Sequence, residues 1–328
     1  MSPILSLSDL SVCFATDEGP VQAVTKLSVD LDEREVLGLV GESGCGKSVT
    51  AMSILGLLPS SAEVTGHVRF RDRDLLALSR SQLQTIRGRE IAMVFQEPMT
   101  SLNPVFTVGR QIGEVIERHE GTSRSASRAR AEELLDLVGI PAPARRVNEY
   151  PHQLSGGMRQ RVMIAMAVAC GPKILIADEP TTALDVTIQA GILDLLRRLR
   201  DELGTAILLI THDLGVVADI ADRVVVMYAG QRVEEAPVEE LFDDPQHPYT
   251  IGLLKAIPRL GATSGTGERR LAEIPGTVPV LSEPPAACAF APRCPRADDV
   301  TKSQVPELSM VRARHYVACF HPGMDGTR

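Results

Sequence analysis

Short apolar runs alternate with longer amphipathic stretches along most of the chain. The runs are only a few residues long and rich in Val, Ile and Leu, which is typical of buried strands. They are Leu5–Phe14, Leu27–Leu31, Val36–Val40, Gly66–Phe70, Ile91–Phe95, Ile174–Ala177, Ala206–Ile210 and Val224–Met227. Apolar residues at helical spacing predict helices within residues 48–58, 107–139, 157–170 and 188–203. Strands that alternate with helices indicate an α/β core with a mostly parallel sheet.

Two stretches depart from this alternation. The block from about residue 98 to 160 is mainly helical and is a candidate subdomain. Residues 261–268 are rich in Gly, Ser and Thr, as linkers are, and prolines are dense over residues 275–306. We therefore predict one domain over residues 1–258 and a small C-terminal extension over residues 259–328.

Composition and charge narrow the class of protein. A chain of 328 residues with 44% hydrophobic content can bury a substantial core. Its net charge of −8 argues against broad nucleic-acid binding, which needs uncompensated Lys and Arg. We find no signal peptide and no apolar run of the roughly 20 residues that cross a bilayer. We therefore expect a cytoplasmic chain whose connection to any membrane passes through a partner.

The glycine-rich segment 41–48 fits the pattern G-x-x-x-x-G-K-[ST] of phosphate-binding loops. A predicted strand precedes it and a predicted helix follows it. Glycines let backbone N–H groups close on a phosphate, Lys47 adds a charge beside the β- and γ-phosphates, and the Ser48 hydroxyl can ligate Mg²⁺. The predicted nucleotide-binding residues are Gly41, Glu42, Ser43, Gly44, Cys45, Gly46, Lys47, Ser48 and Val49.

Two carboxylates, Asp178 and Glu179, directly follow the predicted strand 174–177. At the carboxyl end of a parallel strand, Asp178 can hold the Mg²⁺ shell, and Glu179 can polarise a water for attack on the γ-phosphate. A second anion-facing helix start is predicted where Ser155 precedes Gly156 and Gly157. Two such helix starts suggest one nucleotide shared within a chain or across a dimer.

Further motifs, in the same order along residues 4–257, resemble the ATP-binding subunits of ABC transporters. Leu154–Gln160 resembles the signature motif of that family, Gln96 its Q-loop glutamine, Thr182–Asp185 its D-loop and His212 its switch histidine. The resemblance implies a P-loop NTPase (ABC ATPase) core with a mostly parallel sheet, an N-terminal antiparallel β part, a helical subdomain and a small C-terminal extension. It also implies ATP and Mg²⁺ as cofactors.

The same resemblance implies a role for each matched residue. Glu179 would be the general base, His212 would orient water and γ-phosphate, and Gln96 would contact Mg²⁺ and sense the membrane subunit. Two ATPase subunits would pack head to tail. The tip formed by Ser155, Gly156 and Gly157 would then contact the γ-phosphate bound by the partner, with the D-loop residue Asp185 at the same interface. The implied Mg²⁺ ligands are Ser48, Gln96 and Asp178.

Phe14 stands where the family usually places an aromatic ring that stacks on adenine, although a phenylalanine at the end of an amphipathic strand is also a common core residue. Because none of the matched positions departs from the family pattern, we expect a hydrolysis-competent site.

Three segments resemble the dipeptide/oligopeptide (peptide/nickel) importer branch of the family. They are Glu97–Gly109, His247–Pro258 and Cys288–Pro295. The branch implies two integral membrane permease subunits, an extracytoplasmic solute-binding protein and a second ATPase subunit, which we expect to be a sister subunit rather than a second copy. The chain would sit at the cytoplasmic face of the cell membrane and drive uptake of di- or oligopeptides. Nickel and glutathione-like solutes stay open as alternatives.

The cysteines of the extension leave several interpretations open. In that branch four cysteines are thought to hold an iron–sulfur cluster in some members. Cys288, Cys294 and Cys319 match three of them, and Thr301 stands where the fourth is expected. Three thiolates could hold a cluster or zinc with a further ligand from Asp298, Asp299 or His315. They could also be reduced thiols in a proline-rich module, which we favour.

Two other function classes were weighed against transport. A soluble ABC ATPase that acts on DNA or ribosomes usually carries long coiled coils or two cassettes, whereas this chain has one cassette, no sustained heptads and an acidic balance. A purely structural nucleotide-binding module would not need the intact Glu179 and His212. We therefore expect a transport ATPase without nucleic-acid partners.

Overall fold

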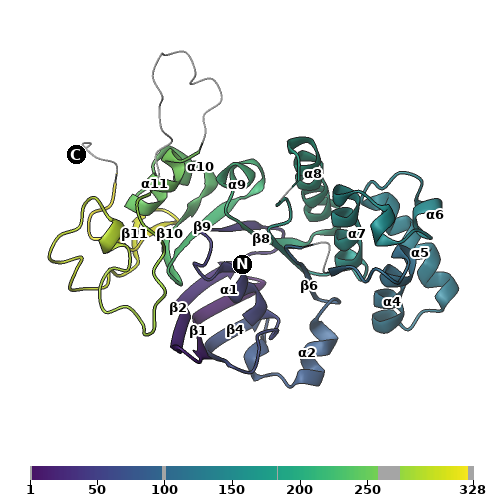
Figure 1. Ribbon diagram of the computed structural model, residues 1–328, viewed down its shortest axis with the longest axis horizontal. Helices are drawn as coiled ribbons and strands as arrows, with labels where there is room; N and C mark the ends of the chain where they lie inside the picture. The colour runs from purple at the N-terminus through teal and green to yellow at the C-terminus, as the bar shows by residue number, and fades with distance from the viewer. Residues whose placement is uncertain (1, 98–100, 183, 258–273, 324–328) are drawn as a thin grey trace, which may run out of the picture. The chain divides into compact units, whose positions relative to one another are not determined.

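The computed structural model describes residues 2–97, 101–182, 184–257 and 274–323. The chain forms two compact units. Figure 1 labels their helices and strands. The first unit comprises residues 1–4, 31–36 and 71–210, and the second comprises residues 5–30, 37–70 and 211–328. Each unit is therefore assembled from segments far apart in the sequence. The predicted linker 261–268, the boundary at residue 258, and residues 98–100 and 183 of two motifs lie outside the described residues.

A parallel sheet forms the core of the first unit. Its neighbouring strands in this unit are β6 (Ile91–Val94), β7 (Ile174–Asp178) and β8 (Ala206–Thr211), with Ile174 opposite both Ile91 and Ala206. Every residue of β7 and β8 is buried, so these strands appear in the sequence as unbroken apolar runs. The predicted strands agree with the observed ones to within one residue at each end. Because the strands are parallel, their carboxyl ends lie at the same edge.

Helices make up most of the rest of the first unit. They are α2 (Arg80–Ile86), α4 (Val108–Glu120), α5 (Arg124–Leu137), α6 (Pro143–Arg146), α7 (Gly156–Val168) and α8 (Val186–Leu203). Helices α4, α5 and α7 pack against one another. The amphipathic block predicted over residues 107–139 is two helices, because Gly121, with φ of 67°, ends α4 and the Ser123 side chain caps α5. The three packed helices span residues 108–168.

The second unit contains the N-terminal antiparallel sheet that the family resemblance implied. Its strand order is β2 (Gly19–Leu31), β1 (Leu5–Thr16) and β4 (Ala62–Phe70). Strands β1 and β4 run antiparallel, with Leu5 opposite Phe70 and Phe14 opposite Ala62. Strand β2 is longer than the predicted segment 27–31, because its first half alternates polar and apolar residues instead of forming an apolar run.

The C-terminal extension adds strands to the sheet that contains β3 (Val36–Val40) and β9 (Arg223–Tyr228). Strand β3 pairs in parallel with β9. Strands β10 (Gln231–Pro237), β12 (His315–Val317) and β11 (Ser309–Arg312) then continue the sheet in antiparallel order. None of these three strands was predicted, since each is short or polar. The helices of the unit are α1 (Lys47–Ile54), α9 (Leu214–Ile220), α10 (Val238–Asp243) and α11 (Pro248–Lys255).

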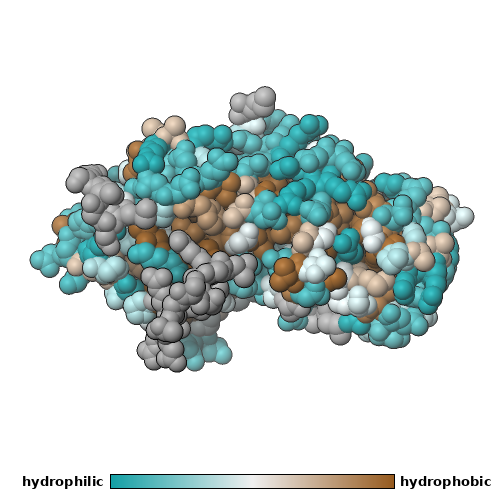
Figure 2. Space-filling model, turned by 90° about the horizontal axis from the view of Figure 1, so that it is seen from above, coloured by the Kyte–Doolittle hydropathy of each residue, from teal (hydrophilic) through white to brown (hydrophobic). Residues whose placement is uncertain are grey.

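The visible surface is mainly hydrophilic, with smaller apolar patches between polar residues (Figure 2). Within the described residues, no helix combines the length and the apolar character that crossing a bilayer would require. Buried positions instead concentrate on β3, β7, β8 and β9, which form the centres of the two parallel strand groups. These strands position the loops described next.

Candidate functional site

The glycine-rich loop lies between the buried strand β3 and helix α1, as predicted. Gly41 has φ of 152°, and a Cβ added there would lie 2.3 Å from the Met227 carbonyl oxygen. At Gly46, with φ of 101°, it would lie 2.5 Å from the Ala23 carbonyl oxygen. Both contacts are with backbone atoms that cannot move aside cheaply. The loop therefore requires glycine at these two positions for packing as well as for its backbone angles.

Lys47 begins helix α1 and turns its ammonium group back into the loop. Its Nζ donates to the carbonyl oxygens of Gly41 at 2.8 Å and Glu42 at 3.0 Å, and lies 3.7 Å from the Cys45 Sγ. Cys45 is fully buried, and this burial raises the pKa of its thiol, although nearby Lys47 acts in the opposite direction. Cys45 is therefore a small packed side chain within the loop rather than a reactive thiolate.

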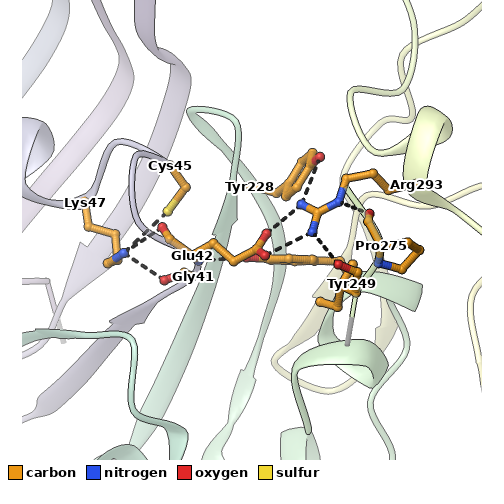
Figure 3. A network of polar contacts seen from close by, with 9 residues as sticks. Gly41, Glu42, Cys45, Lys47, Tyr228, Tyr249, Pro275 and Arg293 are labelled. Carbon is orange, nitrogen blue, oxygen red and sulfur yellow. Dashed lines mark hydrogen bonds and ion pairs between the residues drawn. The ribbon is translucent and has the colours of Figure 1, made fainter. Parts of the chain in front are cut away.

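Glu42 of the loop makes two contacts that sequence reasoning did not predict (Figure 3). Its backbone N–H donates to the Tyr249 hydroxyl at 2.8 Å. Its carboxylate accepts from Arg293 at 2.6 and 3.0 Å. Tyr249 and Arg293 follow Glu42 by 207 and 251 residues, so no local pattern could have linked them to the loop.

In the first unit, the structure brings two predicted catalytic residues into direct contact. The Gln96 Nε2 donates to the Glu179 Oε2 at 2.9 Å, and the Thr182 hydroxyl donates to the same oxygen at 2.7 Å. Glu179 has φ of 48°, and its backbone N–H donates to the Ile210 carbonyl at the end of β8. The left-handed backbone at a non-glycine residue is sparsely populated, so the surrounding contacts hold this carboxylate in place. The sequence placed Thr182 in the D-loop motif but did not predict its hydrogen bond to Glu179.

Asp178 is the last residue of β7 and is only 4% exposed. It lies opposite Ile210 in the β7–β8 register. Buried carboxylates are rare unless they are paired or bind a cation, so this position is consistent with the predicted ligand role.

The predicted signature residues form the exposed start of helix α7. The Ser155 side chain accepts from the Met158 N–H at 3.4 Å, as an N-cap does. A Cβ added at Gly156 would meet no atom within 4 Å, whereas one at Gly157 would lie 2.6 Å from the Ile188 Cγ2 of helix α8. The Asp185 side chain in turn caps α8 by accepting from the Ile188 N–H at 2.9 Å. Gly156 therefore faces open space, and Gly157 allows two helices to approach.

His212 and Phe14 lie in the second unit with the glycine-rich loop. His212 is exposed and directly follows β8, and the neighbouring Asp213 caps helix α9. Phe14 is half-buried near the end of β1. The predicted site residues thus form two groups. Gly41–Val49, Phe14 and His212 belong to the second unit, whereas Gln96, Asp178, Glu179, Ser155–Gly157 and Asp185 belong to the first.

The cysteines of the extension are half-buried, and none of the six cysteines in the chain forms a disulfide. Burial raises the pKa of the Cys288 and Cys294 thiols and raises that of Cys319 to about 11. No group of three or more His, Cys, Asp or Glu side chains within the described residues is arranged to hold a metal ion.

Two of the candidate fourth ligands have other partners. His315 is fully buried, and its Nε2 lies 2.8 Å from the Glu234 Oε1. The Asp298 carboxylate accepts from the Thr301 N–H at 2.9 Å and pairs with His321. Asp298 and His315 are therefore engaged with other residues instead of facing the three thiols as a fourth ligand.

Comparison with known families identifies two segments of the chain. The sequence profile of the ABC transporter family matches residues 24–182. The profile described as the oligopeptide/dipeptide transporter C-terminal region matches residues 233–300. The second segment extends from β10 through Arg293, so it includes residues that contact the glycine-rich loop.

Individual proteins show the same similarity. The oligopeptide transport ATP-binding protein OppD of Bacillus subtilis is 52% identical over 97% of this chain and 89% of its own length. OppD of Mycobacterium tuberculosis is 52% identical over 97% of this chain, which spans 52% of that longer protein.

Solved structures of ATP-binding cassettes resemble the fold. A dimeric post-hydrolysis state of the cassette MJ0796, bound to ADP and Pi, has a TM-score of 0.64 and 29% identity, covering 71% of this chain and 98% of that one. The structure of cbiO1 from Clostridium perfringens, part of the transporter complex cbiONQ, has a TM-score of 0.63 and 28% identity, covering 74% of this chain and 91% of that one.

Proposed function

The chain belongs to the ATP-binding subunits of ABC transporters, and we propose that it hydrolyses ATP to drive an importer of di- and oligopeptides. The cargo class is supported by the family of its C-terminal region and by relatives named for oligopeptide transport. The observation that supports hydrolysis most directly is the carboxylate of Glu179, held by two side-chain donors at the end of β7. A carboxylate fixed in this way is suited to position and activate a water molecule.

We propose the following division of work in hydrolysis. The loop Gly41–Val49 binds the phosphates, with Lys47 supplying positive charge. Glu179 orients a water molecule, and the oxygen of this water attacks the γ-phosphorus. The Glu179 carboxylate accepts the proton that the water loses. The bond between the γ-phosphorus and the bridging oxygen of the β-phosphate breaks, and ADP leaves. Gln96 and Thr182 keep the carboxylate aimed at that water. His212 would hydrogen-bond the γ-phosphate, and Phe14 would stack on adenine.

Mg²⁺ fits the predicted ligand set, because the Ser48 hydroxyl, the Gln96 amide oxygen and the Asp178 carboxylate are all hard oxygen donors. The Gln96 amide nitrogen donates to Glu179, which leaves its oxygen to face a cation. When bound, Mg²⁺ would neutralise charge on the β- and γ-phosphates.

We further propose that a second ATPase subunit completes the site. The exposed Ser155 and Gly156 at the start of α7 are suited to reach a phosphate bound by a partner, because a Cβ added at Gly156 would meet no atom of the described residues within 4 Å. The similar cassette MJ0796 is dimeric with ADP and Pi bound, which supports a paired arrangement. Asp185, which caps α8 beside Gly157, would lie at the same interface. A sister subunit is expected as the partner, and a second copy is the alternative.

The helical block offers a docking place for a permease subunit. An open hollow of about 790 Å³ lies on it, lined by Asn103, Phe106, Gln111, Glu114, Val115, Glu117, Arg118, His119 and Met166. Phe106, which lines the hollow, is 45% exposed, and its chain neighbour Val105 is 70% exposed. Exposed apolar side chains at a hollow of mixed lining suit a short helical segment of another protein. Two permeases in the membrane and an extracytoplasmic binding protein would place this chain at the cytoplasmic face of the membrane.

Uptake assays in intact cells test the cargo. The chromosomal copy is deleted and replaced by the wild-type chain or by Glu179→Gln, and uptake of a labelled tripeptide, of nickel and of glutathione is measured. We expect the wild-type chain, but not the Glu179→Gln variant, to restore tripeptide uptake. Restoration of nickel or glutathione uptake without tripeptide uptake would assign a different cargo.

A fractionation experiment tests the class of protein. We expect the tagged chain to co-purify with integral membrane subunits after detergent extraction. Recovery on ribosomes or DNA instead would support a soluble ABC ATPase and would contradict the transport function.

A further inference from the structure

Arg293 of the C-terminal extension places its guanidinium group against the phosphate-binding loop. It lies at the end of a short turn, Ala291–Arg293, and its side chain is only 5% exposed. Nη1 and Nη2 donate to the two carboxylate oxygens of Glu42 at 2.6 and 3.0 Å, so the pair is bidentate. This geometry and the burial of the arginine distinguish the pair from an exposed surface ion pair, which contributes little.

Every donor of this guanidinium group has an acceptor nearby. Nε donates to the Pro275 carbonyl at 2.8 Å, Nη2 also donates to the Ile274 carbonyl at 3.2 Å, and Nη1 also lies 3.5 Å from the Tyr228 hydroxyl. The Glu42 carboxylate raises the pKa of Arg293 above its ordinary value, so the group stays charged. A lysine could not reproduce this planar arrangement. Arg293 therefore links three parts of the chain, which are Glu42 of the phosphate-binding loop, Tyr228 of β9 and the backbone of residues 274–275.

Glu42 is in turn held at each of its polar groups. Its N–H donates to the Tyr249 hydroxyl, its carbonyl oxygen accepts from Lys47, and its carboxylate binds Arg293. In Figure 3 the Glu42 side chain extends from the loop toward Arg293, on the side opposite Lys47. Glu42, whose carbonyl oxygen accepts a hydrogen bond from Lys47, is thus also the loop residue that Arg293 of the extension binds.

Apolar packing fixes the extension beside the loop. Phe290 packs edge-on against Tyr228, with ring centroids 5.1 Å apart, and lies 5.5 Å from Tyr249 and 5.6 Å from His247. Tyr228 and Tyr249 also make an edge contact at 4.8 Å. These rings are buried, so Arg293 is presented from a rigid support.

A carboxylate within a phosphate-binding loop needs an explanation, because an unpaired negative charge there would repel the ligand. We propose that Arg293 is a positioning residue for ATP, which neutralises Glu42 and fixes the loop so that Lys47 and the backbone N–H groups are ready for the phosphates. The extension thereby becomes part of the nucleotide site. This inference rests on the proposed binding of ATP phosphates by residues 41–48.

A double-mutant cycle on the assembled transport complex tests the proposal. The KM and kcat for ATP hydrolysis are measured for Arg293→Gln, Glu42→Gln and the double variant, and nucleotide affinity is measured with a fluorescent ATP analogue. We expect Arg293→Gln to raise the KM for ATP about tenfold with a smaller change in kcat, since it frees a charge beside the phosphates. In the Glu42→Gln background the same substitution should change the KM less than twofold.

Arg296→Gln is the matched control. Arg296 also lies in the extension, and its Nη1 donates to the His321 carbonyl at 2.8 Å, so we expect the KM of this variant to remain that of the wild type. Arg293→Lys retains the charge without the bidentate fork, and it takes the place of Arg293→Gln if that variant does not fold. We expect a smaller rise in KM from the lysine variant, which again disappears in the Glu42→Gln background.

The outcomes separate this proposal from the assignment of the loop itself. Lys47→Ala is measured in parallel. Suppose that Lys47→Ala abolishes ATP binding, but that folded Arg293 variants leave the KM for ATP unchanged or change it equally with and without Glu42. The proposed role of Arg293 is then wrong, and the assignment of the loop stands. If Lys47→Ala leaves ATP binding intact, the loop assignment itself is wrong.

Discussion

The Gln96 amide donates a hydrogen bond to the carboxylate of Glu179 across a gap of 2.9 Å. One residue follows β6 and the other follows β7, and these strands are neighbours in a parallel sheet. The contact therefore follows from the topology, because adjacent parallel strands bring their carboxyl ends to one edge. Gln96, which is proposed to contact Mg²⁺ and to sense the membrane subunit, is thus linked by one hydrogen bond to Glu179, the proposed general base.

The second donor to Glu179 gives the first prediction. Thr182→Val keeps the shape of the side chain but removes the hydroxyl that lies 2.7 Å from the Glu179 Oε2. We expect kcat for ATP hydrolysis to fall about fivefold, the effect of one hydrogen bond worth about 1 kcal/mol, with little change in KM. Steady-state kinetics of the assembled complex measure this.

Thr187→Val is the control, since Thr187 is exposed in the first turn of α8. A Thr182→Val enzyme with wild-type kcat would show that Gln96 alone suffices to orient the base.

The two glycines at the start of α7 should respond differently to the same added methyl group. Gly156→Ala meets open space, so thermal stability should not change, but turnover should fall at least tenfold if this face approaches a partner's phosphate. Gly157→Ala would place a Cβ 2.6 Å from Ile188 and should cost about 1–3 kcal/mol of stability. Thermal melts and ATPase assays on both variants compare these effects. Normal turnover in Gly156→Ala would argue against a composite site.

His247 should make the second unit sensitive to mild acid. Burial lowers its pKa to about 4, with a further lowering by Arg296 and an opposing effect of Glu234. The unfolded chain binds a proton at His247 below about pH 6.5, whereas the folded chain does not do so until about pH 4, so stability falls as pH decreases through this window. The loss between about pH 7 and pH 5 should be about 2 kcal/mol.

His247→Asn isolates this contribution. The His247 Nδ1 accepts from the Tyr249 N–H, and asparagine can cap helix α11 in the same way without titrating in this range. Urea unfolding at several pH values should therefore give a flatter pH dependence for the variant, even if its stability is lower throughout. Equal slopes for both proteins would assign the acid sensitivity to other groups.

The extension should contain no iron. Within the described residues, no group of three or more His, Cys, Asp or Glu side chains is arranged to hold a metal ion, and Thr301 stands where the fourth cysteine is expected. Anaerobically purified protein should show no absorption above 400 nm beyond background and no bound metal, with Thr301→Cys as the variant that restores the four-cysteine pattern. Stoichiometric iron in the wild-type chain would contradict the structure-based assignment.

The nucleotide motifs and the parallel strands could be predicted because their signals are local. Gly41–Ser48 and the buried runs of β3, β7 and β8 each occupy one short window, and β6, β7 and β8 are neighbours in the order in which they occur along the chain. Arg293 could not be found in this way. Its partner Glu42 lies 251 residues away, and both residues have ordinary neighbours in the sequence.

The edge of the sheet that contains β3 and β9 escaped prediction for a different reason. Strands β11 and β12 are too short for a period of two to be recognised, and they become strands only because β10 offers an unpaired edge. The placement of the extension, and hence of Arg293, depends on this tertiary pairing and on the packing of Phe290 among Tyr228 and Tyr249.

A single-turnover experiment tests most directly that Glu179 hydrolyses ATP bound by this chain. The assembled complex is loaded with radiolabelled ATP, Mg²⁺ is added, and phosphate release is followed by quenched flow for the wild type and for Glu179→Gln. We predict that the variant binds ATP as tightly as the wild type but forms phosphate at least a hundredfold more slowly, as loss of a general base requires. Phosphate release by Glu179→Gln at the wild-type rate would contradict this mechanism.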